Sequence, residues 1–186
     1  CNLNGVSGNE DEVRKFILGY LSDRHVERCV DRMGHVHAMS GGGSTNRLML
    51  NAHMDEIGLM IMTLETNGTL RFSPVGGIDQ RLLPGTRVVI GRNRVPGIIG
   101  VKPIHLQGKE EREKAFPIDT LFIDCGFVNE KEAEKYVKPG EYAAFDVSSK
   151  KIGDDHVMGK AMDNRTGCAI LLRILAEYKN LNFTAV

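Results

Sequence analysis

The chain of 186 residues is long enough to form one domain, or two small ones, around a hydrophobic core. Hydrophobic residues make up 41% and charged residues 26%, as in ordinary globular proteins. Lys and Arg together number 24, as do Asp and Glu, so no net positive charge favours nucleic acid or an anionic membrane surface. Apolar runs stay well below the ~18 residues of a membrane-spanning helix. We therefore expect neither nucleic acid nor a membrane as a partner.

The first long element predicted is a helix in the stretch SGNEDEVRKFILGYL, residues 7–21. Ser7 and Glu10 form a capping-box pattern at its start. Two short strands, HVERCVDRM and HVHAM, follow, with a turn at Gly34 between them. The apolar residues expected on one face of the helix are Val13, Phe16, Ile17, Tyr20 and Leu21.

The next stretch, RLMLNAHMDEIGLMIM at residues 47–62, places ionisable groups inside an apolar run. RLMLNA predicts a core strand after the loop SGGGSTN, and IGLMIMTL continues in an extended conformation. His53, Asp55 and Glu56 lie between these two apolar segments. Burying such groups is costly unless they are paired, hydrogen-bonded or bound to metal. The cluster is therefore a candidate functional site.

From about residue 65, short strand-like runs alternate with turn sequences such as PVGG, LPGT and GVKP. Closely spaced strands of this kind predict a small β-barrel or sandwich. Within this region QGKEEREKA is typical of a solvated loop, whereas DTLFIDCG and KPGEYAAFD predict strands. NEKEAEKY predicts a short helix capped by Asn129 and Glu132.

After KIGDDHVMGKAM, the stretch DNRTGCAILLRILAEYKN predicts a second long helix, and LNFTAV predicts the start of a strand. An α/β start, a β-rich middle and an α/β return indicate one domain inserted in another. Residues 1–63 and 155–186 would form the α/β domain, and residues 64–154 the β-rich insert. The apolar residues at helical spacing in the second helix are Ile170, Leu171, Ile174, Leu175 and Tyr178.

The four cysteines, Cys1, Cys29, Cys125 and Cys168, are widely spaced and form no metal-binding or redox pair. Cys29 and Cys168 fall within apolar patterns, where a free thiol behaves as a small hydrophobic group. We therefore expect reduced core cysteines and a cytoplasmic protein.

His53 and Asp55 can act together because residues two apart on a strand point to the same side. If His53 binds a metal through one ring nitrogen, Asp55 can accept a hydrogen bond from the other and fix the tautomer. Alternatively, a neighbouring backbone carbonyl satisfies His53. The triplet alone leaves both interpretations open.

Asp163 and Asn164 stand at the start of the second long helix. Their simplest role is to cap it, since Asp and Asn are preferred capping residues and a carboxylate suits the positive end of the helix dipole. The functional alternative is a carboxylate that bridges two metal ions, with Arg165 neutralising or positioning nearby groups. Taken alone, this motif favours capping.

NAHMDEIGLMI and GKAMDNRTGCAILL together resemble the TET-type metallo-aminopeptidases, which are the glutamyl and deblocking aminopeptidases. Further matching stretches are GVSGNEDEVRKFI, SPVGG, GIIGVKPIHL, LFIDCG and KPGEYAAFD, and their order agrees along essentially the whole chain. The resemblance implies an α/β, mixed-sheet peptidase domain with a two-metal site. It also implies that the β-barrel-like insert, roughly residues 64–154, is a dimerisation domain.

By the same resemblance, His53 binds one metal ion, Asp163 bridges both, and Asp55, to which we assign a catalytic role, orients His53. A metal pair ~3.5–4 Å apart activates water and polarises the scissile carbonyl in peptide hydrolysis. Zinc suits such a site best, with cobalt or manganese as alternatives. The implied partners are peptide substrates and further copies of the chain, as dimers and up to a dodecamer.

Several other residues in family-typical stretches or elsewhere receive no role from the resemblance. Those in family-typical stretches are Glu56, His105 and Arg165. The remaining histidines, which have no motif around them and are expected on the surface or in loops, are His25, His35, His37 and His156.

The family pattern continues beyond Val186 with the general-base Glu, an adjacent Glu ligand, a further acidic ligand and a second His. We therefore expect the chain to be the N-terminal portion of a longer enzyme, with an incomplete metal site and no activity by itself. Two other functions stay open. One is a glycoside hydrolase using Asp55 and Glu56, although adjacent strand residues point to opposite faces. The other is a non-catalytic assembly fragment.

Overall fold

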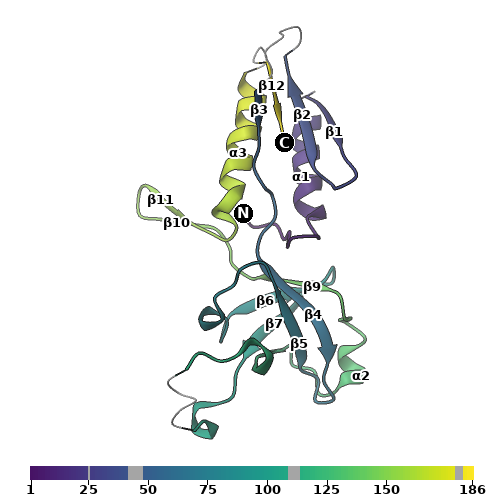
Figure 1. Cartoon of the computed structure of the whole chain (residues 1–186), viewed down its shortest axis with the longest axis vertical. Coiled ribbons are helices and arrows are strands. Elements are labelled where there is room, and N and C mark those ends of the chain that lie inside the picture. The colour runs from purple at the N-terminus through teal and green to yellow at the C-terminus, as the bar shows by residue number, and fades with distance from the viewer. Residues whose placement is uncertain (25, 42–47, 109–113, 179–181) are drawn as a thin grey trace. The chain divides into compact units, whose positions relative to one another are not determined.

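A computed structural model describes residues 1–24, 26–41, 48–108, 114–178 and 182–186 (Figure 1). The chain divides into two compact units, here termed the α/β unit (residues 1–56 and 149–186) and the barrel unit (residues 57–148). The elements of the α/β unit are α1 (Asp11–Ser22), β1 (Glu27–Val30), β2 (Val36–Ser40), β3 (Leu48–Leu50), β10 (Lys150–Ile152), β11 (His156–Met158), α3 (Met162–Glu177) and β12 (Phe183–Ala185).

The α/β unit is built on a four-stranded mixed sheet with the order β1-β2-β12-β3. Strand β12 runs antiparallel to β2 and parallel to β3, so the last strand of the chain lies between two early ones. This mixed sheet confirms the predicted α/β class, and β12 confirms the strand predicted in LNFTAV. The core contributed by the sheet, α1 and α3 consists of Leu21, Ala38, Leu175, Phe183 and Ala185.

Helix α1 starts later than predicted. Its N-cap is Glu10, which makes no side-chain capping bond, and Ser7 instead donates a hydrogen bond to Asp55. The predicted cap at Ser7 is therefore wrong. Gly8, at φ +89°, turns the chain before the helix can begin. Phe16 is also 56% exposed rather than buried, because at 100° per residue it lies well around the helix from the buried Leu21.

Other apolar positions expected in the core are exposed in the described residues. In β3, which is an outer strand of this sheet, Leu48 and Met49 are 58% and 63% exposed. On α3, Ile170 is 55% exposed and Leu175 is buried, and Tyr178, the residue that follows the helix, is 54% exposed. The helical period of α3 was predicted correctly, but only part of its apolar stripe faces the sheet and α1.

The barrel unit is closed by six strands in the order β4-β5-β8-β7-β6-β9, which confirms the predicted barrel-like part. Its core includes Leu59, Ile61, Leu70, Ile90 and Ile123, each at most 1% exposed. The elements are β4 (Gly58–Leu64), β5 (Leu70–Val75), η1 (Gln80–Leu82), β6 (Arg87–Ile90), β7 (Val95–Gly100), η2 (Ile104–Leu106), η4 (Ile118–Thr120), β8 (Phe122–Asp124), α2 (Glu130–Ala133) and β9 (Tyr142–Phe145).

The barrel unit begins and ends earlier in the sequence than predicted. It begins at Ile57 and ends at Ser148, whereas the sequence placed the insert at residues 64–154. The earlier start follows because β4 pairs with β5 and β9 and so belongs to the barrel.

The predicted cap pair of the short helix is confirmed: Asn129 accepts a hydrogen bond from the Glu132 amide at 3.0 Å.

All four cysteines are free, as expected, but Cys29 is exposed on β1 and is not a core residue. The β10–β11 hairpin was not predicted, because its exposed strands carry charged residues and lack an apolar face. None of the helices in the described parts of the chain is long and apolar enough to cross a bilayer.

Candidate metal centre

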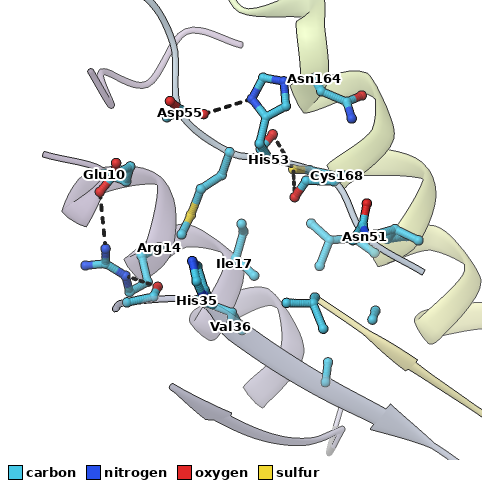
Figure 2. A pocket seen from close by; sticks show the side chains of 18 of the residues that line it. Glu10, Arg14, Ile17, His35, Val36, Asn51, His53, Asp55, Asn164 and Cys168 are labelled. Atoms are coloured by element: carbon cyan, nitrogen blue, oxygen red, sulfur yellow. Dashed lines mark hydrogen bonds and ion pairs between the residues drawn. The ribbon is translucent and has the colours of Figure 1, made fainter. Parts of the chain in front are cut away.

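The three residues singled out in the sequence lie together in the α/β unit. His53 follows β3 on a segment anchored by the Ala52 amide, which donates to the Val186 carbonyl at 3.0 Å. Its Nδ1 lies 2.8 Å from Oδ1 of Asp55, and its Nε2 lies 3.1 Å from Oδ1 of Asp163. Figure 2 shows the imidazole ring beside Asp55, near the first turn of α3. One imidazole is thus placed between two carboxylates.

Asp55 is held on two sides. Its Oδ1 faces His53, and its Oδ2 accepts the hydroxyl hydrogen of Ser7. Partial burial raises the pKa of Asp55, but the hydrogen bonds from Ser7 and His53 outweigh burial and leave that pKa below its usual value. The residue is therefore a carboxylate at neutral pH, fixed in orientation by Ser7. Sequence reasoning missed Ser7 because its local pattern resembled a helix cap.

At the start of α3, the two roles considered, capping the helix and binding a metal ion, fall to different residues. Asn164 Oδ1 accepts a hydrogen bond from the Gly167 amide at 3.2 Å, so the capping contact is made by Asn164. Both residues have non-helical backbone angles, and the peptide bond between them is cis. Asp163 has a side chain 96% exposed, with Oδ1 directed at His53. Its carboxylate is available to a ligand.

The charge of His53 follows from its neighbours. Partial burial lowers the pKa of the imidazole, but the hydrogen bonds and negative charges of Asp55 and Asp163 more than offset this, so the pKa of His53 is raised. The position between the carboxylates therefore favours a positive charge. Either a proton on the imidazole or a metal ion at Nε2 can supply it.

Glu56, which the sequence left without a role, anchors a buried ionic cluster. It is 5% exposed, and its Oε1 lies 2.9 Å from Nζ of Lys160 and 3.4 Å from Nη2 of Arg165. The Gly5 amide donates to the same oxygen at 3.0 Å. Burial lowers the pKa of Lys160, and Glu56 partly offsets that effect. The cluster ties the segment after His53 to the loop that leads into α3.

Arg165 extends this network through its other donors. Its Nε donates to the Met54 carbonyl at 2.9 Å, and its Nη1 donates to the Leu3 carbonyl. A Cβ on Gly5 would lie 2.8 Å from Nη2 of Arg165, so a larger residue there would displace the guanidinium. Arg165 therefore holds the Met54 carbonyl and the Glu56 carboxylate, on either side of Asp55, rather than contacting the candidate site itself. The sequence signal for it was its place directly after Asp163 and Asn164.

A cavity of about 750 Å³ lies beside His53 and Asp55 within the α/β unit. Figure 2 shows His53, Asp55 and Asn164 toward one side of it and Ile17 and Val36 toward the other. The apolar part of its wall comes from α1, β2 and α3. His53, Asp55 and Asn164 thus form one polar part of its wall, and Glu10, Arg14 and His35 form another.

Of the other histidines in the described structure, His35 lines the same cavity as His53, although it contacts neither His53 nor Asp163 through a hydrogen bond. His105 is exposed on η2 of the barrel unit, and His156 is exposed on β11. His25 lies outside the described residues. His35 and His37 contact Asp31 on the β1–β2 hairpin.

Comparison with known proteins places the fold in a class. The fold matches the TET aminopeptidase from the marine sediment archaeon Thaumarchaeota archaeon SCGC AB-539-E09 with a TM-score of 0.91 and 31% identity, covering 99% of this chain and 54% of that one. It also matches Pyrococcus horikoshii TET1 peptidase, described as assembling into a tetrahedron or a large octahedral shell, with a TM-score of 0.87 and 32% identity over 98% of this chain and 56% of that one. The α/β unit and barrel are thus those of a TET-type peptidase.

The sequence comparison is more specific. The profile of the M42 glutamyl aminopeptidase family matches residues 34–186, and the chain belongs to that family. It is 36% identical over 175 residues to an aminopeptidase candidate of Acetivibrio thermocellus, covering 94% of this chain and 51% of that protein. The chain thus spans about half the length of the curated relatives it matches. The resemblance identified from the sequence motifs is confirmed.

Proposed function

We propose that the protein is a metal-dependent aminopeptidase that removes residues from the N-termini of peptides, and that His53, Asp55 and Asp163 belong to its metal centre. The observation that carries the proposal is the placement of His53 between two carboxylates. Membership of an aminopeptidase family supports the reaction class.

The donor set fits a divalent metal ion. Two ligand atoms, each ~2.0–2.1 Å from a tetrahedral ion, lie roughly 3.3 Å apart, and Nε2 of His53 is 3.1 Å from Oδ1 of Asp163. Imidazole nitrogen and carboxylate oxygen are both zinc ligands, and cobalt or manganese can use the same donors. His53 and Asp163 would hold the metal, and Asp163 has a second oxygen free for another ion. We propose two ions, with zinc as the preferred metal.

Asp55 acts on the metal through His53. By accepting the Nδ1 hydrogen, it keeps the Nε2 lone pair available for coordination and makes the imidazole a stronger donor. Ser7 fixes the other oxygen of Asp55, so the ring cannot easily rotate. Asp55 is in this sense a positioning residue.

When bound, the metal pair lowers the pKa of a water molecule and polarises the scissile carbonyl. The contribution of this chain is to fix two donors with the correct protonation. The buried cluster of Glu56, Lys160 and Arg165 supports this by holding the backbone of both donor segments.

The test is hydrolysis of aminoacyl p-nitroanilides by the protein expressed from its complete gene. We expect activity that a chelator removes and zinc or cobalt restores. His53→Gln and Asp163→Asn should abolish it, whereas His156→Gln, an exposed residue on β11, should leave it unchanged. Full activity after exhaustive metal removal would contradict the proposal.

Glycoside hydrolysis fits the site poorly. Glu56 would have to act as an acid or nucleophile beside Asp55, but its carboxylate is buried against Lys160 and Arg165. A soluble cellulose derivative assayed beside the peptide substrate separates the two reactions. Release of reducing sugar at a comparable rate would favour the glycosidase.

We further propose that the protein is cytoplasmic and forms homo-oligomers through the barrel unit. The four free thiols support a reducing compartment. Exposed apolar side chains on the barrel, such as Leu82 (72%) and Ile98 (52%), support a protein contact there. Sedimentation velocity of the protein from its complete gene would reveal a dimer or larger particle. A strictly monomeric protein would exclude such assembly, including a dodecamer.

A further inference from the structure

We propose that Asp31, His35 and His37 form a second zinc site on the β1–β2 hairpin, with three protein ligands and at least one water. These residues lie outside every motif that identified the family, and they share no ligand with His53 and Asp163. The proposal does not rest on the aminopeptidase activity.

The geometry of the three ligand atoms fits one metal ion. Oδ2 of Asp31 lies 2.9 Å from Nδ1 of His35 and 3.1 Å from Nε2 of His37, and all three atoms lie within 4.8 Å of one another. Ligand atoms around a tetrahedral zinc ion are separated by roughly 3.3 Å. The two contacts with Asp31 would open by a few tenths of an ångström around an ion, and the two imidazole nitrogens, at most 4.8 Å apart, would settle at a similar separation.

The carboxylate is oriented by the hairpin itself. Oδ1 of Asp31 accepts hydrogen bonds from the amides of Met33 and His35, each at 2.9 Å. The Gly34 amide donates to the Asp31 carbonyl, and Gly34 has a φ of +91°, which closes the turn. Because Oδ1 is occupied by the backbone, Oδ2 is the oxygen that faces the imidazoles.

The two imidazoles converge because of their spacing. His37 lies on β2 and His35 directly precedes it, so residues two apart project to the same side of the strand. Their ring centroids are 6.4 Å apart with an angle of 68°, and they present Nδ1 of one ring and Nε2 of the other. His-x-His on an extended segment thus supplies two nitrogen donors to one point.

Charge and exposure also suit a metal ion. Hydrogen bonding, above all from His37, holds the pKa of Asp31 well below its usual range, so this ligand is anionic at neutral pH. The side chains of His35, His37 and Asp31 are 57%, 32% and 36% exposed, so an ion can enter and keep water as a further ligand. Two imidazoles with one carboxylate favour zinc over calcium or magnesium, which prefer oxygen ligands.

Without metal, the same residues make only exposed hydrogen bonds and ion pairs, which contribute little to stability. The alternative is therefore a simple polar turn. The two interpretations differ in zinc binding, in the residues responsible for it, and in the coordination geometry.

The test uses the 186-residue chain carrying His53→Gln and Asp163→Asn, which removes the proposed catalytic ligands. Titration against a zinc-chelating dye should show one bound zinc ion per chain. Adding His35→Gln and His37→Gln should weaken that binding by more than roughly 100-fold, whereas adding His156→Gln should not change it. Cobalt substitution should give the visible absorption of a four-coordinate ion.

Zinc binding that persists after replacement of His35 and His37, or that is absent before it, would overturn the proposal. The same His53→Gln, Asp163→Asn chain provides a second measurement, because cobalt bound at this hairpin should broaden the NMR signals of the His35 and His37 imidazoles. Sharp signals at saturating cobalt would also overturn it. Loss of activity in His53→Gln leaves this result unaffected, so failure of the proposed function and of the hairpin site can be distinguished.

Discussion

The sheets of the two units differ in whether they have edge strands. In the barrel unit the six strands close on themselves, so every strand has two neighbours and side chains such as Leu59 and Ile123 are completely buried. In the described α/β unit, β1 and β3 are outer strands, and Leu48 and Met49 of β3 are mostly exposed. The candidate metal ligands all lie in this second unit.

The difference indicates what holds each unit together. The barrel relies on a continuous apolar core, whereas the α/β unit has a smaller core and adds the buried cluster of Glu56, Lys160 and Arg165. Polar anchoring positions functional groups more specifically than apolar contact does, but removing one partner is costly.

The largest effect is expected from Glu56→Gln. The change leaves Lys160 and Arg165, whose side chains are 7% and 5% exposed, without a compensating charge. We expect the free energy of unfolding of the α/β unit to fall by about 3–5 kcal/mol, measured by hydrogen exchange of the β2 and β12 amides. The amides of the barrel should keep their protection.

The matched control is Glu177→Gln, which breaks the exposed pair with Arg173 on α3. It should cost less than about 1 kcal/mol. Equal effects of the two substitutions would show that the buried cluster is not what stabilises the unit.

The next effect concerns the barrel core. Ile123→Ala removes a fully buried side chain, and we expect a loss of about 2–5 kcal/mol in the free energy of unfolding of the barrel. Ile170→Ala on α3, where the side chain is 55% exposed, should stay within about 0.5 kcal/mol. Denaturant titration with hydrogen exchange assigned to each unit measures both. A large loss at Ile170 would mean that it is covered in solution.

Thiol reactivity should distinguish the partly buried Cys125 of the barrel from the exposed Cys29 of the α/β unit. Burial, aided by the charge of Asp124, raises the pKa of Cys125 in the barrel to about 11. Compared with a thiol of pKa 9.0, this leaves about 100-fold less thiolate at pH 8. Iodoacetamide should therefore modify the exposed Cys29 first, and modification of Cys125 should accelerate as the pH approaches 11. Mass spectrometry of the peptides would contradict this if both reacted at the same rate.

The smallest effect is expected at His53 in the metal-free chain. Because Asp163 helps to raise the pKa of the imidazole, Asp163→Asn should lower that pKa, whereas Asp154→Asn on the β10–β11 hairpin should not. The stabilisation from the charged imidazole is complete below its unfolded pKa near 6.5 and is lost as the pH rises through the higher folded pKa. NMR titration of the imidazole measures the shift, and an unchanged pKa would contradict the contact.

Local patterns predicted most of the fold. The barrel, the cap of α2 at Asn129 and Glu132, and strand β12 follow from periodicity and turn residues over a few positions. The same local reasoning failed at Ser7, where a distant partner, Asp55, competes for the hydroxyl that a helix amide would otherwise use. It also failed at Leu48, because periodicity identifies an apolar strand without showing what covers it.

The candidate site was predictable only in part. A resemblance carried by two separated motifs brought His53 and Asp163 together, although they lie 110 positions apart. The contacts of Glu56 with Lys160 and Arg165 span 104 and 109 positions, and no local pattern indicates such pairs. His35 and His37 were expected on the surface or in loops; His35 is exposed and His37 is half-buried. Their convergence on Asp31 depends on a turn whose hydrogen bonds periodicity cannot reveal.

The position of β12 between β2 and β3 has a consequence for folding kinetics. The barrel unit forms from contacts within one continuous segment. The sheet of the α/β unit, in contrast, is incomplete until β12, which follows that segment in the chain, pairs with β2 and β3. Loops this long delay the contacts that they join. We expect pulsed hydrogen exchange to show protection in the barrel before β2 and β3. During synthesis the barrel would then be complete before β12 can pair with β3, the strand that precedes the candidate site residue His53.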